Sequence, residues 1–446
     1  MKDFIRFSKI LIKRNALWLT LLFFLVLLVN TMGAKNEIEE FVNQTSYQTG
    51  KLQWIYESKE EKIEYSLDES YGYFTALYEE SSEFESDIKD KLHSKEAKDD
   101  IFKDFHRKYT EILDYYNIDE KKLLETDWSR SNTNDDNDEE HYQRNLYQEI
   151  YNYQNYMYKE VGYNPEKDAF NFSGKIANPT GLLPFVIIII GFLFTSLDHL
   201  TSYYEFTRIL PWKKEKSFIM KIVFGSLIVI GVYLVLLGIN YMTWSNSAFG
   251  DKFVLNGIFI EILKKLGIYF SILSITMAVG EVSGNVLGHA GLLIIVLSGF
   301  NLIEVNILTF INMFKEVSNT PIVRNFNSFI DNNNILKVIY FPLNGLVSNI
   351  TTEIITFFAV GIVFLGLGIL FTRISKAERS GMLIQNKYIS KYAEILAIIS
   401  TANLLSAIFG ITMGNYGSIL RIAIFVIVAL LSYKFYKLLF NVRVGI

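Results

Sequence analysis

The chain has 446 residues, a formal net charge of −4 and an apolar fraction of 50%, with the apolar residues gathered in blocks. This composition places the chain among membrane proteins. The absence of cysteine excludes disulfides, thiol catalysis and cysteine-ligated metal.

Charge divides the chain into segments of two kinds. Residues 34–180 hold 34 acidic and 18 basic side chains, a net charge of −16, whereas the rest of the chain has a net charge of +12. We therefore expect three parts: residues 1–33, an acidic water-soluble domain at 34–180, and a basic membrane domain at 181–446.

The N-terminal residues 1–33 are predicted to form an amphipathic helix that leads into the first membrane span. Basic and apolar side chains alternate before Ala16, a pattern typical of a helix at the membrane interface. A cleaved signal peptide is the alternative interpretation. The apolar stretch is long for a signal peptide and further spans follow it, so we favour an uncleaved anchor.

The acidic domain shows apolar side chains at spacings of three and four and no clear strand alternation, which predicts a bundle of amphipathic helices. Its tyrosine-rich segment 142–158 is interpreted as an aromatic core edge in preference to a binding surface. Its acidic segment 134–140 lacks the glycine and the terminal glutamate of a calcium loop, so a solvated loop is the favoured interpretation.

Eight apolar stretches are predicted to cross the bilayer as helices. The predicted spans are Ala16–Met32, Leu182–Leu197, Phe218–Tyr241, Ile262–Val282, Leu287–Ile311, Ile350–Thr372, Ile395–Met413 and Ile419–Phe435. A short outer loop at Trp244–Leu255 is predicted between the third and fourth spans, and a tight inner turn around Glu281, Gly284, Asn285 and Gly288 between the fourth and fifth. Because basic loops stay inside, the basic N-terminus predicts that both termini are cytoplasmic and that residues 34–180 are extracytoplasmic. A large outer domain without cysteine favours a bacterial cell membrane.

Ionisable side chains at membrane depth are costly and therefore mark candidate functional positions. Glu304, with Asn301 and Asn306 in the fifth span, is the candidate pathway-lining group. Five others lie near predicted span ends, where contact with lipid headgroups would satisfy them. These are Asp198, His199, Glu281, Glu353 and Arg421.

No motif for nucleotide binding or hydrolysis is present. The patterns GxxxxGK[ST], HExxH and GxSxG are all absent, and the five histidines are scattered. We therefore expect no catalytic residue, no metal site and no cofactor bound by this chain, which is not expected to be an enzyme. No nucleic-acid partner is expected either.

The segment 203–221, YYEFTRILPWKKEKSFIMK, joins the second and third spans through a predicted cytoplasmic loop at 200–217. Its pattern E-F-x-R-x-L-P-W-K-K-x-K resembles the first cytoplasmic loop of ABC-2 type transporter permeases, which forms a coupling helix that docks on an ATP-binding subunit. An ordinary basic inner loop is the alternative. The resemblance implies these ATPase-coupling residues: Glu205, Phe206, Arg208, Leu210, Pro211, Lys213 and Lys214.

A second predicted inner loop, 373–393, carries a K-x-E-x-(A/S)-G pattern similar to that of permeases of Gram-positive ABC exporters. The matching residues are Lys376, Glu378, Ser380 and Gly381. The chain departs from those permeases after the glycine. They tend to carry a short apolar segment there, whereas this chain has the five residues Met382–Asn386, MLIQN.

These patterns predict an all-α polytopic membrane protein with about eight transmembrane helices and a large helical extracytoplasmic domain between spans one and two. The resemblance implies the permease subunit of an ATP-driven exporter that moves a peptide such as a bacteriocin, a lipid-like molecule or a drug outward. Its partners would be an ATP-binding cassette subunit, which binds ATP and Mg, and a second permease in a homodimer or heterodimer. The alternative is a membrane receptor, sensor or immunity protein whose outer domain binds a peptide.

Overall fold

The structure is a computed structural model of the chain. It describes residues 2–61, 110–111, 113–114, 150–160, 162–164, 169–179, 181–196, 213–247, 249–250, 253–297, 306, 350–375, 381–413 and 418–441. The chain divides into two compact units. Unit 1 comprises Met1–Val26, Gly181–Tyr233 and Ile262–Ile446, and unit 2 comprises Leu27–Thr180 and Leu234–Glu261.

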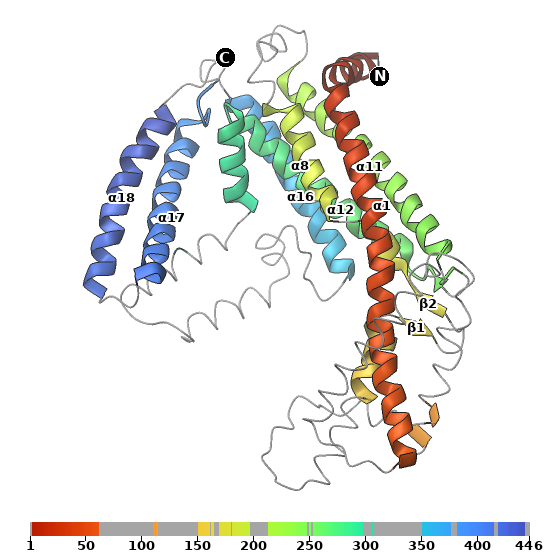
Figure 1. The fold of residues 1–446 in the computed structure, drawn as a ribbon. Coiled ribbons are helices and arrows are strands. Elements are labelled where there is room, and N and C mark those ends of the chain that lie inside the picture. The colour runs from red at the N-terminus through yellow and green to blue at the C-terminus, as the bar shows by residue number, and fades with distance from the viewer. Residues whose placement is uncertain are drawn as a thin grey trace. The chain divides into compact units, whose positions relative to one another are not determined.

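Helices make up most of the described chain (Figure 1). They are α1 (Lys2–Glu61), the π-helix η3 (Asn155–Glu160), α7 (Ser173–Ala177), α8 (Leu182–Phe194), α11 (Lys214–Ser245), α12 (Ile258–Val282), α16 (Ile350–Ile374), α17 (Lys387–Met413) and α18 (Ser418–Asn441). A shorter apolar helix covers Val286–Leu297. The strands are β1 (Tyr163–Asn164), β2 (Ala169–Asn171) and β3 (Phe253–Val254).

Five of the described helices are long and apolar enough to cross a membrane: Phe4–Phe41, Ser173–Phe194, Lys214–Ser245, Thr351–Ile374 and Ile422–Asn441. They coincide with the predicted spans one, two, three, six and eight, which confirms a helical membrane protein. The predicted fourth and seventh spans coincide with α12 and α17, which are not among the five. Of the predicted fifth span, the structure describes residues 287–297 and Asn306.

Unit 1 is built around α12. Nearly every residue of α12 from Gly267 to Val282 is buried, as expected for a helix that is apolar on all sides. Its side chains join one apolar core with those of α8, the 286–297 helix, α16, α17 and α18. Small residues allow close helix contacts, because a side chain at Gly191 of α8 or Gly361 of α16 would overlap α12. α17 and α18 also pack side by side (Figure 1).

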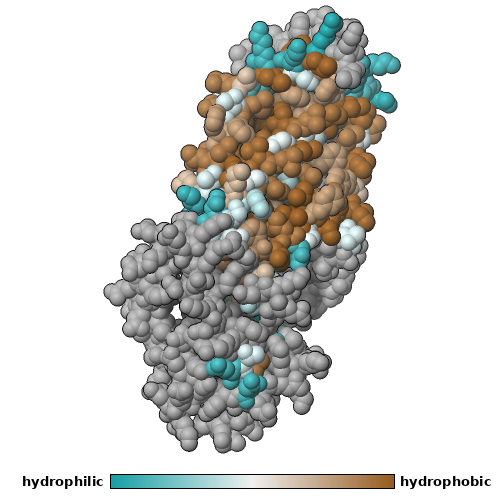
Figure 2. Space-filling view, turned by 90° about the vertical axis from the view of Figure 1, so that its right-hand side faces the viewer, coloured by the Kyte–Doolittle hydropathy of each residue, from teal (hydrophilic) through white to brown (hydrophobic). Residues whose placement is uncertain are grey.

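The outward faces of the unit 1 helices are apolar. Leu17, Trp18, Leu21 and Phe24 of α1 are each more than half exposed. Figure 2 shows a broad hydrophobic band with hydrophilic side chains gathered at its upper end. An apolar surface this large is unfavourable in water, so it is the surface that the bilayer would cover.

Unit 2 contains a three-stranded sheet of order β1-β2-β3, with β2 antiparallel to β1 and parallel to β3. The register pairs Tyr163 with Phe170 and Phe170 with Phe253. The sequence predicted only helices in the outer domain, and the strands β1 and β2 correct this expectation. The predicted outer loop at residues 244–255 contributes β3 and the buried Trp244 and Phe249 to the same unit. Strands of two or three residues are too short to show alternation.

Candidate functional site: the polar end of unit 1

The predicted coupling segment is only partly described. Glu205, Phe206, Arg208, Leu210 and Pro211 lie outside the described residues. Lys213 and Lys214 are exposed and lie at the start of α11. In the second predicted motif, Lys376, Glu378 and Ser380 are likewise outside the described residues, and Gly381 is within them.

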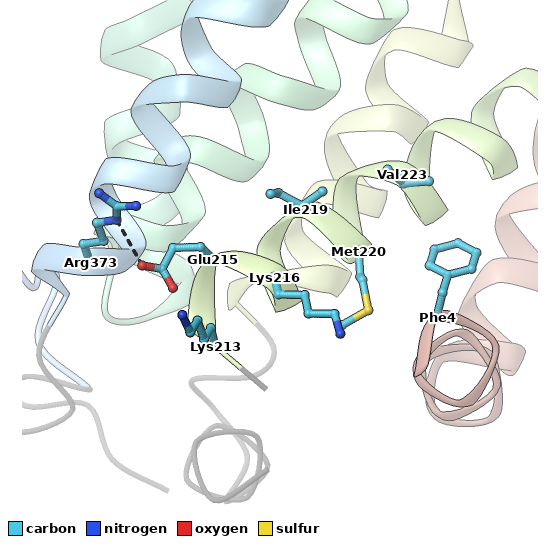
Figure 3. A pocket seen from close by; sticks show the side chains of 8 residues that line it. All are labelled: Phe4, Lys213, Glu215, Lys216, Ile219, Met220, Val223 and Arg373. Atoms are coloured by element: carbon cyan, nitrogen blue, oxygen red, sulfur yellow. Dashed lines mark hydrogen bonds and ion pairs between the residues drawn. The ribbon is translucent and has the colours of Figure 1, made fainter. Parts of the chain in front are cut away.

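An ion pair joins the first turn of α11 to the last turn of α16. The carboxylate of Glu215 accepts a hydrogen bond from Nε of Arg373 at 3.0 Å (Figure 3). The Arg373 side chain is 62% exposed, so solvent screens the pair and it contributes little to stability. The pair matters for geometry, because it holds the end of the predicted coupling loop next to the start of the second inner loop.

A second, more buried ion pair joins α11 to α12. Nζ of Lys221 lies 3.8 Å from Oε1 of Glu281, and their side chains are 9% and 12% exposed. The sequence interpretation that Glu281 is satisfied by lipid headgroups is therefore wrong, because its charge is largely buried within the protein beside a lysine. Burying either charge alone would be costly, so the pair fixes α11 against the end of α12.

Residues 282–285 of the turn after α12 bind residues 381–385 before α17, and we call this arrangement the clamp. Gly284 N donates to Leu383 O at 3.1 Å, Gly381 N to Gly284 O at 2.9 Å, and Gln385 N to Val282 O at 2.9 Å. Ser283 and Ile384 form an antiparallel bridge. Two segments that are both predicted to be cytoplasmic and lie far apart in sequence are therefore joined by backbone hydrogen bonds.

Two buried amides complete the clamp. Asn285 Nδ2 donates to Gly381 O at 3.1 Å, and Gln385 Nε2 donates to Ser283 O at 3.1 Å. Asn285 Oδ1 also accepts from Gly288 N at 2.7 Å, which caps the start of the 286–297 helix. Gln385 lies in the segment where the sequence departs from the permease pattern, and no sequence motif assigned it a role.

Glycine is required at two positions of the clamp. Gly381 has φ of +87°, a left-handed conformation that side chains disfavour. A Cβ on Gly288 would overlap the backbone carbonyl of Leu383, so the two segments can meet only at a residue without a side chain. The backbone conformation at residue 381 therefore explains why the predicted second motif has a glycine there.

A buried histidine follows the clamp directly. His289 Nε2 lies 2.8 Å from Thr276 O, and Nδ1 bonds the hydroxyl of Ser196. A carbonyl can only accept, so Nε2 carries the proton and Nδ1 accepts from Ser196. The ring stacks on Phe192 with centroids 3.9 Å apart. No sequence pattern marks this site, because its residues come from separate helices.

The predicted pathway triad is described at one position. Asn301 and Glu304 lie outside the described residues, whereas Asn306 is 8% exposed and packs on α17. Its Nδ2 donates to Ser400 Oγ at 2.9 Å, and Asn403 Nδ2 donates to its Oδ1 at 2.7 Å. These contacts place Asn306 in a polar contact between helices.

A further buried ion pair joins α12 to α16. Nζ of Lys264 lies 2.5 Å from Oε2 of Glu353, whose side chain is 1% exposed. The expectation that Glu353 reaches the headgroups is therefore wrong. Asp198 and His199 lie outside the described residues, as does the side chain of Arg421.

No group of three or more histidine, aspartate or glutamate side chains suited to a metal ion occurs among the described residues. Comparison with protein-family models, with curated proteins and with solved structures finds no match for this chain. Function must therefore be inferred from the chain's own residues.

Proposed function

We propose that this chain is the permease subunit of an ABC-2 type exporter in a bacterial cell membrane. It would work beside a second permease, identical or related, and receive the energy of ATP hydrolysis from a separate ATP-binding cassette protein. The cargo would be a peptide such as a bacteriocin, a lipid-like molecule or a drug, moved outward.

The observation that carries this proposal is the set of contacts at the polar end of unit 1. The start of α11 forms the last part of the segment that resembles a coupling helix. It is tied to α16 by Glu215–Arg373 and to α12 by Lys221–Glu281. The end of α12 is tied by the clamp to the start of α17. A force applied before α11 would thus reach the helices that pack in one core.

The same contacts support the proposed topology. The start of α11, the turn after α12 and the end of α16 are each expected in the cytoplasm from sequence. The contacts that join these segments require all of them to lie on the same side of the membrane. Their basic flanks favour the cytoplasm. In this topology eight spans leave both termini inside and the acidic domain 34–180 outside.

The test is a pull-down from membranes in which the chain is expressed together with a candidate ATP-binding cassette protein from the same genome. Glu205→Ala combined with Arg208→Ala should abolish co-purification of the ATPase, or its stimulation by substrate, without reducing membrane insertion. The control Lys434→Ala removes an exposed basic residue of α18, far in sequence from the loop, and should leave both unchanged. Undiminished coupling in the double variant would refute the assignment and favour the receptor or sensor alternative.

A further inference from the structure

A pocket lies at the polar end of unit 1, between the starts of α1 and α11 and the end of α16. It is lined by Phe4, Lys213, Glu215, Lys216, Ile219, Met220, Val223 and Arg373. Figure 3 shows Lys213 and Lys216 projecting on one side of α11, with Arg373 at one edge and Phe4 at the other. Three helices of one unit thus build the walls.

The polar part of the pocket is basic. Three basic side chains and one carboxylate line it, a net charge of +2, and the carboxylate of Glu215 is already bonded to Arg373. The lining thus holds more positively than negatively charged side chains. The adjacent N-terminus of α11 adds the positive end of a helix dipole. A phosphate group matches this surface in charge.

The remaining part of the pocket is apolar and leads away from the lysines along α11. Ile219 and Val223, one helical turn apart, are 41% and 44% exposed. The next turns of α11 continue with Leu227 and Ile230, which are 55% and 38% exposed. A soluble anion would leave this wall uncovered, whereas an acyl chain would cover it.

We propose that the pocket binds an anionic glycerophospholipid. Lys213 and Lys216 hold its phosphate, and one acyl chain lies along Ile219 and Val223. Under the proposed topology this lipid belongs to the inner leaflet, beside the predicted coupling segment. The site itself does not depend on the transporter assignment, because binding requires neither ATP nor a partner protein.

The experiment measures thermal unfolding of the purified full chain in a neutral detergent while phosphatidylglycerol is titrated in. Phosphatidylglycerol should raise the midpoint, and phosphatidylcholine should raise it much less. Lys213→Gln combined with Lys216→Gln should weaken the apparent affinity about tenfold or more, since each basic contact with an anionic lipid contributes substantially. Val223→Ser should weaken it while leaving the charge unchanged.

The matched control is Lys387→Gln combined with Lys391→Gln, which removes two exposed lysines of α17 from the second inner loop. This control should keep most of the phosphatidylglycerol effect. If both double variants weaken phosphatidylglycerol binding equally, the lipid is attracted by the overall positive charge, and the proposed site is wrong. Equal stabilisation by inorganic phosphate or glycerol phosphate would overturn the lipid and identify a soluble anion. If the glutamine variant misfolds, Lys213→Arg with Lys216→Arg must preserve binding, and its loss would also contradict the proposal.

Discussion

At the scale of single residues, Gly288 shows how closely the two segments of the clamp approach one another. Neither its spacing nor its neighbours mark it as important, and the sequence placed it only in a tight inner turn. The structure adds the reason, because the carbonyl of Leu383 occupies the position a side chain would take. For Gly291, in the same helix, no atom of another described segment lies within 4 Å of the position a methyl group would occupy, so this glycine provides a matched comparison.

We predict that Gly288→Ala destabilises unit 1. Either the clamp hydrogen bonds must lengthen or the 286–297 helix must shift, at a cost of about 1–3 kcal/mol for overpacking. The midpoint of thermal unfolding in detergent should fall.

Gly291→Ala is the control and should leave that midpoint unchanged or slightly raised, since alanine favours helix. Equal midpoints for the two variants would contradict the close contact between Gly288 and Leu383.

For charged residues inside the apolar helices, too, the sequence did not reveal which residues they contact. Position along a predicted span suggested that Glu281 and Glu353 reach the headgroups. The structure pairs them with Lys221 and Lys264 instead. Both lysines come from other helices, so one-dimensional position could not reveal the pairs. Lys264, a basic residue near the start of the predicted fourth span, has Glu353 as its ion-pair partner.

At the scale of elements, the sequence located helices well and their ends poorly. The predicted first span ends at Met32, yet α1 continues to Glu61 without a break. A helix of 60 residues is about 90 Å long, three times the thickness of the hydrocarbon core. A change from apolar to charged residues marks the end of a span and does not mark the end of a helix.

The end of α11 and the residues after it belong to the core of unit 2. Trp244 is fully buried. The centroid of its ring lies 4.3 Å from the ring centroid of Phe172 and 5.9 Å from that of Phe41. Phe41 also packs edge to face on Phe249 at 5.0 Å. Segments from α1, the β2–α7 region and the loop after α11 thus share one aromatic cluster.

We predict that Trp244→Ala loosens unit 2, because removal of a buried tryptophan costs about 3–5 kcal/mol. Limited proteolysis of the purified protein should cut residues 34–180 faster in this variant. Trp18→Ala changes a tryptophan that is 56% exposed in unit 1, and should leave the rate unchanged. Identical cleavage rates in both variants would be incompatible with a core role for Trp244.

At the scale of the whole molecule, the proposed topology makes a direct prediction about sidedness. The chain has no cysteine, so a single introduced cysteine is the only thiol that can be labelled. Gln44 of unit 2 and Lys387 of unit 1 are both exposed. With Gln44→Cys, a membrane-impermeant maleimide should label intact cells, because residues 34–180 are expected outside.

With Lys387→Cys, labelling should appear only after the membrane is permeabilised, since the second inner loop is expected in the cytoplasm. The natural chain is the blank, and labelling in detergent shows that each thiol is reactive. The reverse labelling pattern would show that the topology is inverted. Labelling of both sites in intact cells would show that the second inner loop does not lie in the cytoplasm.

The sequence alone determined the membrane class and the approximate position of the apolar helices, because burial in a bilayer requires long uninterrupted apolar segments that composition displays directly. It also identified Gly381 and the turn at 284–288 as distinct features. Only the tertiary structure decided that this turn and residues 381–385 bind one another, that Glu281 and Glu353 have lysine partners, and that Trp244 lies in a core. Hydrogen bonds and ion pairs between distant segments depend on how helices pack in three dimensions, and no local pattern records which segments meet.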